Sequence, residues 1–153
     1  MGLVLSDRLV EEARTVAEAV RSRLTAAAVA GELVLTGALS VPGALTKGDI
    51  DLHLRVDDRF AEVAERVARL YSPAERQAWA PTLAVFAVPA ARDTGLAVTP
   101  RGSVHDVRFT RAWERLRADA SLLEEYNALK RGWFGTPEYA ERKAAFFGRI
   151  TGT

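Results

Sequence analysis

The sequence predicts an α+β (mixed α/β) fold, in which a small mixed sheet carries flanking helices and a helical C-terminal segment. The predicted strands gather between residues 32 and 98, and three helical patterns follow them. Strands that cluster while helices trail are typical of this class rather than of a doubly wound sheet. A chain of 153 residues has the usual size of one domain. We therefore expect residues 1–153 to form a single domain, with 104–150 as its C-terminal helical part.

The first predicted element is an amphipathic helix that reaches about Ala30. Ser6 is the predicted N-cap, because a hydroxyl at this position accepts a hydrogen bond from a free backbone N–H. Apolar residues then recur every three or four positions and form one stripe: Leu9, Ala13, Val16, Val20 and Leu24. Gly31 ends the pattern, as glycine commonly does at helix C-termini. We expect this helix to serve packing and to carry no chemistry.

Two strands and the loop between them form the most informative part of the chain. Glu32–Thr36 is a short apolar run bounded by glycines, which favours a buried strand. Residues 37–48 hold three glycines and a proline and cannot form one regular element. In Ile50–Val56 apolar and polar residues alternate, and a period of two predicts a strand with one polar face. That face carries Asp51, His53 and Arg55.

The remaining elements follow from the same periodicities. A second helix begins at Asp57 and Asp58, and two further strands cover Thr82–Val88 and Gly95–Val98. Helical patterns then cover residues 105–116, 121–130 and 137–150, with Thr136 as the N-cap and Pro137 as the first residue of the last helix. The aromatic residues of this segment are expected to form the core of a helical cap: Trp113, Tyr126, Trp133, Phe134, Phe146 and Phe147.

Composition excludes several classes of protein. The net charge is +1, from 21 basic and 20 acidic residues, so a general nucleic-acid binder is not expected. Without cysteine there are no disulfides, thiolate metal sites or cysteine nucleophiles. Charged residues stand where a signal peptide would be apolar, and no apolar run approaches the roughly 18 residues of a membrane span. We expect a soluble, cytoplasmic protein with no membrane partner.

The candidate site lies where the first strand gives way to the loop and the next strand opens. Asp49 and Asp51 stand two residues apart, so their side chains project from the same face of a strand. Paired carboxylates chelate hard divalent cations such as Mg²⁺, which commonly joins protein carboxylates to substrate phosphates. Gly37 at the preceding turn would let a phosphate approach backbone N–H groups.

This arrangement resembles the signature of the nucleotidyltransferase superfamily: an apolar strand, G-[GS], a spacer, and D-h-[DE]-h. Gly37 and Ala38 stand in the first place and Asp49–Leu52 in the second, with ten residues between them. The segment Gly37–Lys47 more specifically resembles the GrpB family, a nucleotidyltransferase-like group with a G-S-T-x-x-P-G-x-x-x-K segment.

Two later blocks strengthen the resemblance to the GrpB family. Gly102–Lys130 resembles that family's G-S…F-R-x-x-L-R…Y-x-x-L-K block, and Tyr139, Lys143 and Phe147 resemble its final Y-x-x-x-K-x-x-F helix. The resemblance therefore runs from about residue 32 to residue 150.

The resemblance implies a function and a role for each motif residue. It implies a nucleotide or another phosphorylated small molecule bound with Mg²⁺ or Mn²⁺, and transfer of a nucleoside monophosphate with pyrophosphate leaving. Asp49 and Asp51 would hold the metal and act as the catalytic pair. The predicted substrate-binding residues are Gly37, Ala38, Ser40, Lys47 and Arg55, with Ser40 replacing the hydroxyl that Ala38 lacks.

The chain departs from the superfamily pattern in two further respects. The third carboxylate normally sits on a later strand, yet neither Thr82–Val88 nor Gly95–Val98 contains an acid. Asp93 falls in a turn and Asp106 at a helix start. In addition, matching the GrpB segment through its proline, glycine and lysine makes Asp51 and His53 the metal pair, a set that favours transition metals.

Two alternatives stay open, a silent module and a nucleic-acid adaptor, and neutralisation by Arg55 or a homodimer contact would favour the first. A catalytically silent binding or interaction module of the same fold would explain Ala38 and the missing third acid. Arg55 shares a face with the aspartates and could neutralise one of them. The C-terminal helices could also form a homodimer contact, whereas a nucleic-acid adaptor ranks last because the charge is near neutral.

Overall fold

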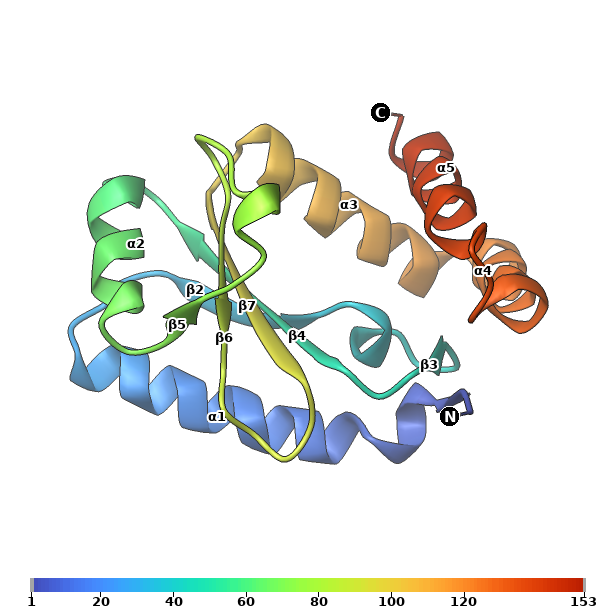
Figure 1. The fold of residues 1–153 in the computed structure, drawn as a ribbon, viewed down its shortest axis with the longest axis horizontal. Helices are drawn as coiled ribbons and strands as arrows, with labels where there is room; N and C mark the ends of the chain where they lie inside the picture. The colour runs from blue at the N-terminus through green and yellow to red at the C-terminus, as the bar shows by residue number, and fades with distance from the viewer. Residues whose placement is uncertain (1, 153) are drawn as a thin grey trace.

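The computed structural model describes residues 2–152, and it has the predicted mixed α/β architecture (Figure 1). The five-stranded sheet has the order β2-β4-β7-β6-β5. Its strands are β2 (Glu32–Thr36), β4 (Ile50–Val56), β7 (Thr94–Pro100), β6 (Ala84–Ala87) and β5 (Ser72–Pro73). β4 and β7 run parallel, and the other neighbours are antiparallel. β2 and β4 have the bounds that the sequence predicts.

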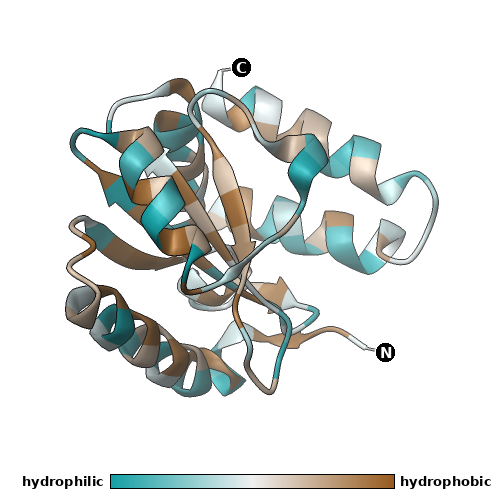
Figure 2. Cartoon of the chain, turned by 60° about the vertical axis from the view of Figure 1, so that its left-hand side comes forward, coloured by the Kyte–Doolittle hydropathy of each residue, from teal (hydrophilic) through white to brown (hydrophobic). Residues whose placement is uncertain are grey.

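Helices α1 (Val10–Ala26) and α2 (Phe60–Ala68) share the larger hydrophobic core with the sheet. β4 contributes its apolar face to this core, and Ile50, Leu52 and Leu54 are at most 1% exposed. In Figure 1, α1 and the third helix, α3 (Val104–Ala118), lie on opposite sides of the sheet. Figure 2 shows the apolar colouring gathered on the strands and hydrophilic residues on the outer surface of α1.

Three C-terminal helices form a second core. α3, α4 (Ala120–Trp133) and α5 (Tyr139–Thr151) pack together around buried apolar side chains. The buried members of this core are Ala38, Val41, Ala44, Leu116, Tyr126, Phe146 and Ile150. Tyr126 and Phe146 are buried in this core, which confirms the prediction of core aromatics for these two residues. Aromatic rings supply much of the apolar area that such a helical cluster buries.

Two predicted N-caps, Ser6 and Thr136, are wrong. Ser6 lies in a short 3₁₀ helix (Ser6–Arg8), where its hydroxyl donates to the carbonyl oxygen of Val41 at 2.6 Å instead of capping α1. α5 begins at Tyr139, since Thr136 directs its hydroxyl back to the carbonyl oxygen of Trp133 at 2.6 Å. In both cases the hydroxyl donates to a carbonyl oxygen and lies outside the first turn of the predicted helix.

Short elements that carry no sequence period complete the fold. β1 (Val4–Leu5) and β3 (Leu45–Thr46) form an antiparallel pair, and 3₁₀ helices cover Ala38–Ser40 and Arg76–Ala78. Across residues 2–152, no helix has the length and apolar character needed to cross a membrane.

Candidate functional site

The turn after β2 is built around a contact between Gly37 and Asp51. The antiparallel register of β2 and β4 pairs Thr36 with Asp51, so the chain turns directly beside that carboxylate. Gly37 has a φ of 71°, and a Cβ there would lie 2.3 Å from Oδ2 of Asp51. Only glycine can accept both the backbone conformation and the close approach. The glycine of the motif is therefore required by the carboxylate that the motif carries.

Asp49 and Asp51 open into a small pocket of about 90 Å³, here called the aspartate pocket. The loop before β4 contributes Ala38 and Lys47 to its wall. The C-terminal helices supply the rest of the lining: Trp113, Tyr126, Lys130, Phe134, Tyr139 and Lys143. The pocket therefore combines two carboxylates with three lysines that come from three separate segments.

The environment of Asp51 raises the pKa of its carboxyl group above the usual value. Burial, and then the neighbouring charge of Asp49, raise the pKa of its carboxyl to about 6. Lys143 and Lys47 act in the opposite direction, because positive charges favour the ionised carboxylate. The two lysines do not outweigh burial, so ionised Asp51 lacks full compensation from the protein.

Helix α4 fixes the loop that carries Lys47. The side chain of Asn127 donates to the carbonyl oxygen of Gly43 and accepts from the backbone N–H of Leu45, each at 2.9 Å. Nζ of Lys130 donates to the carbonyl oxygen of Leu45 at 2.7 Å. Burial, and then the charge of Lys143, lower the pKa of Lys130 to about 8, although both aspartates oppose this shift. Lys130 is thus a buried cation that faces the carboxylates and also holds the loop.

Ser40 and Ala38 lie in the 3₁₀ turn that follows Gly37. Ala38 lines the aspartate pocket, whereas the hydroxyl of Ser40 donates to the carbonyl oxygen of Gly37 at 2.7 Å. The same hydroxyl accepts from Nη1 of Arg117 at 2.9 Å. Its replacement of the missing phosphate-binding hydroxyl stays a prediction, and these two hydrogen bonds compete with it.

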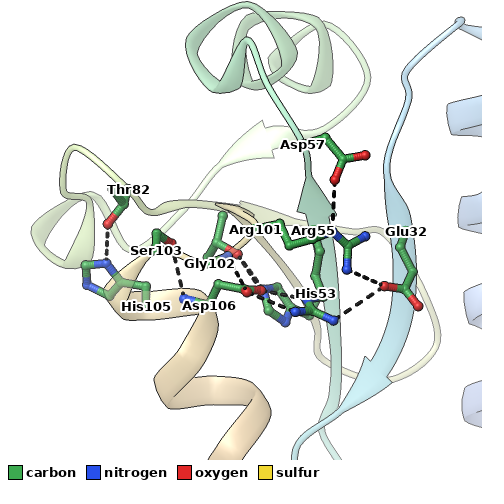
Figure 3. A network of polar contacts seen from close by, with 11 residues as sticks. Glu32, His53, Arg55, Asp57, Thr82, Arg101, Gly102, Ser103, His105 and Asp106 are labelled. Atoms are coloured by element: carbon green, nitrogen blue, oxygen red, sulfur yellow. Dashed lines mark hydrogen bonds and ion pairs between the residues drawn. The ribbon is translucent and has the colours of Figure 1, made fainter.

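His53 and Arg55 belong to a different cluster, which Figure 3 shows around Asp106. Arg55 donates from Nε and Nη2 to the two carboxylate oxygens of Asp106, at 2.6 and 2.9 Å, and also pairs with Glu32. His53 is buried and makes a 2.7 Å hydrogen bond through Nε2 to the hydroxyl of Thr99. Arg55 therefore neutralises Asp106, and not one of the aspartates in the pocket as strand alternation had allowed.

Burial also decides the charge of His53. It lowers the pKa to about 4, although Asp106 at 3.7 Å favours the protonated ring. A neutral imidazole can ligate a metal, so this role of His53 stays a prediction. The aspartate pocket is lined by Asp49 and Asp51 without His53.

The position of a third acid is occupied by glycine. The parallel register pairs Asp51 with Gly95 and His53 with Ala97, and β7 from Thr94 to Pro100 contains no acid. The exposed Asp93 precedes β7, and its carbonyl oxygen accepts from the backbone N–H of Ile50 at 2.8 Å.

Sequence reasoning missed the contribution of the C-terminal helices to the pocket. Lys130 ends the Gly102–Lys130 block and Lys143 lies in the final Y-x-x-x-K-x-x-F helix, but neither is among the predicted substrate-binding residues. The available signal was the recurrence of lysine after tyrosine in both blocks, as in Tyr126–Lys130 and Tyr139–Lys143.

The donor set fits Mg²⁺ or Mn²⁺ bound together with a ligand. Within residues 2–152, no cluster of three or more His, Asp or Glu side chains could hold a metal alone. Mg²⁺ is usually held by one or two carboxylates, substrate phosphates and water. Asp49 and Asp51 would supply the protein's share of such a shell.

Comparisons with known proteins point to one family. The sequence model of the family described as GrpB protein matches residues 8–153. A UPF0157 protein of Vibrio cholerae serotype O1 is 29% identical over 121 residues, and the match covers 76% of this chain and 63% of the relative. The crystal structure of the conserved protein GrpB from Enterococcus faecalis has a TM-score of 0.72 at 17% identity, over 94% of this chain and 90% of that chain.

Nucleotidyltransferases share the fold at larger distance. The crystal structure of the Cid1 poly(U) polymerase with MgGTP has a TM-score of 0.58 at 16% identity, and covers 92% of this chain and 50% of that chain. The same polymerase with Mg 3′-dATP gives a TM-score of 0.54. At these identities the likeness concerns the fold alone, and it confirms the predicted nucleotidyltransferase-like architecture.

Proposed function

This chain belongs to the GrpB family, and from that premise we propose that it binds a nucleotide, or another phosphorylated small molecule, together with Mg²⁺ or Mn²⁺. Asp49 and Asp51 hold the metal in this proposal, and the lysines of the aspartate pocket hold the phosphates.

One observation carries the proposal: two carboxylates and three lysines line a single small pocket. A divalent cation neutralises the carboxylates, and phosphate oxygens then meet the cation and the ammonium groups together. Lys47 is exposed and can follow a ligand, whereas Lys143 is partly buried beside Asp51. This mixture of charges favours a metal-bound polyphosphate over either partner alone.

The state of Asp51 gives the metal its energetic advantage. A carboxyl with a pKa of about 6 resists ionisation in the free protein, because burial removes its hydration. A cation at the carboxylate stabilises the ionised form and replaces the proton. Metal binding therefore relieves a cost that folding imposes on Asp51.

The register of β7 favours a second candidate, a catalytically silent binding module. Transfer of a nucleoside monophosphate, which the family resemblance implies, needs a group that takes the proton of the attacking hydroxyl. Gly95 stands beside Asp51 and has no side chain to do so. Measuring pyrophosphate release in the presence of candidate acceptors separates transfer from silent binding.

Binding itself is tested by a thermal-shift screen of the four nucleoside triphosphates, each with and without Mg²⁺ or Mn²⁺. The variants are Asp49→Asn and Asp51→Asn, with Asp58→Asn as the matched control on an exposed carboxylate. A ligand at about a hundred times its Kd stabilises by about 2.7 kcal/mol, which is a shift of about 5 °C or more at this chain length.

The expected result is a metal-dependent shift in the wild type and in Asp58→Asn that is lost in Asp49→Asn and Asp51→Asn. Absence of any shift in the folded wild type, or a shift that survives both pocket variants, would overturn the proposal.

A further inference from the structure

A second cavity, here called the apolar slot, adjoins the aspartate pocket. It has a volume of about 350 Å³ and lies between the sheet and helices α3 and α5. Its floor is formed by Val85, Gly95 and Ala97, and its walls by Phe109, Trp113 and Phe147. The volume lies within the usual range for a small-molecule pocket.

The slot and the aspartate pocket share part of their walls. Asp51, Trp113 and Lys143 line both of them. A ligand whose phosphates occupy the aspartate pocket can therefore extend its remaining atoms past Asp51 toward the slot.

The floor of the slot is open because its residues are small. A Cβ at Gly95 would meet no atom within 4 Å, and this residue has no left-handed φ that would itself require glycine. Glycine in a strand weakens it and often marks a close approach of another group. The same position that lacks a third acid thus leaves space beside Asp51.

The chemistry of the lining selects a flat apolar group. Three aromatic side chains form the walls, and aromatic rings gain from stacked or edge-to-face contacts beyond their burial. Polar side chains are few in the slot, and Arg108 and Lys143 are cations that favour an aromatic face or an anion. A sugar ring inside the slot itself would fit this lining poorly, because each of its hydroxyls needs a hydrogen bond.

We propose that the apolar slot binds an aromatic ring joined, directly or through a sugar, to the phosphate that the aspartate pocket holds. This inference rests on the proposed function and narrows its ligand to aromatic phosphate compounds, the shared chemistry of nucleotides and simple aryl phosphates. The slot offers few side chains that could form hydrogen bonds with the edge of a ring, so different aromatic rings bind with similar affinity.

Calorimetric titrations with matched ligand pairs test the inference. ATP is compared with tripolyphosphate, and phenyl phosphate with methyl phosphate, all with Mn²⁺. The blocking variant is Gly95→Val, which fills the slot with a residue that strands favour. Gly95→Ala is a smaller second variant, and Gly132→Ala on α4 is the control, because a Cβ there also meets no atom within 4 Å. Urea unfolding verifies that each variant is folded.

The expected result is that ATP binds the wild type and Gly132→Ala at least about tenfold more tightly than tripolyphosphate, a factor typical of one stacked ring. In Gly95→Val this advantage falls to within about threefold, while the affinity for tripolyphosphate is unchanged. The advantage in Gly95→Ala lies between those of the wild type and Gly95→Val. A parallel loss of the advantage of phenyl over methyl phosphate identifies aryl groups in general, and an advantage confined to ATP identifies the nucleobase.

Two different failures are distinguishable. If tripolyphosphate binds through Asp51 but ATP gains nothing, or gains equally in Gly95→Val, the slot does not hold the ring while the proposed function stands. If neither polyphosphate binds the folded wild type with Mn²⁺, the proposed function and this inference fall together.

Discussion

Asp106 is buried and Asp51 is half-buried, and their surroundings move the pKa values of the two carboxyl groups in opposite directions. Burial alone would raise the pKa of Asp106, but hydrogen bonds from Arg55 and from the backbone N–H of Gly102 outweigh it and hold the pKa below its usual value. Burial likewise raises the pKa of Asp51, and there the nearby lysines do not reverse it.

This difference in pKa distinguishes Asp106, a structural carboxylate, from Asp51, a carboxylate that a bound cation would stabilise. Asp106 has an arginine in a two-point contact, which is the strongest arrangement that a protein offers a carboxylate. Asp51 faces Asp49 and more distant lysines, so a cation supplied from outside can improve its environment. The Asp106 cluster should therefore govern stability, and the Asp51 cluster should govern binding.

Replacing Asp106 should have the largest effect on stability. Asp106→Ala leaves Arg55 without its main partner and removes the acceptor for Gly102, and breaking a buried pair in this way costs about 3–5 kcal/mol. Urea unfolding at pH 7.5 measures the loss. If the variant keeps the wild-type free energy of unfolding within about 1 kcal/mol, the structural role assigned to Asp106 is wrong.

Acid should destabilise the protein through His53. Its pKa of about 4 lies below the unfolded value, so its contribution to stability is complete above about pH 6.5 and is lost as the pH falls toward 4. We expect wild type to lose about 2.5 kcal/mol between pH 7.5 and 4.5 relative to His53→Gln, measured by urea unfolding at each pH. Parallel pH profiles of the two proteins would contradict the burial of a neutral imidazole.

Replacing Asp51 should change the stability in the opposite direction, because the unliganded protein gains stability when this carboxyl is removed. Its folded pKa of about 6 exceeds the unfolded 3.8, so its contribution to stability is complete below about pH 4 and is lost as the pH rises through 6. Without a ligand, Asp51→Asn should be more stable than wild type at pH 7.5, by up to about 3 kcal/mol, and the difference should vanish near pH 4. A variant less stable than wild type at both pH values would show that ionised Asp51 is well compensated.

The smallest effect is expected at the loop clamp. Asn127→Ala removes two hydrogen bonds to the loop that carries Lys47 and should cost about 1–2 kcal/mol. Gln77→Ala serves as the control, because its side chain bonds only an exposed neighbour, Glu75. Calorimetric titration with Mn²⁺ and ATP should also show weaker binding in Asn127→Ala, and wild-type affinity would mean that the clamp does not order the site.

Elements whose residues show a clear local period could be predicted from the sequence, and elements fixed by tertiary packing could not. β2 and β4 carry apolar runs and alternation, and their bounds could be predicted residue by residue. β1, β3 and β5 have two residues each, too few to show a period. Alternation also placed His53 on a polar face, yet α3 covers that face and buries the ring.

The strand-and-turn part of the site could be predicted from the sequence, whereas the part formed by the C-terminal helices could not. Gly37, Asp49 and Asp51 lie close together in sequence and form a local motif. Lys130 and Lys143 reach the pocket only because α4 and α5 pack over the loop, a tertiary arrangement that no local pattern encodes. The choice of Asp106 as the partner of Arg55 depends in the same way on the docking of α3.

The most direct test of the prepared carboxylate is a count of bound Mn²⁺ by the electron paramagnetic resonance signal of the free ion at pH 7.5, with and without ATP. We predict ATP-dependent Mn²⁺ binding by the wild type and none by Asp51→Asn, a variant that we expect to be folded and more stable than the wild type without ligand. Equal Mn²⁺ binding by both proteins would contradict the assignment of Asp51 as the carboxylate that awaits a metal.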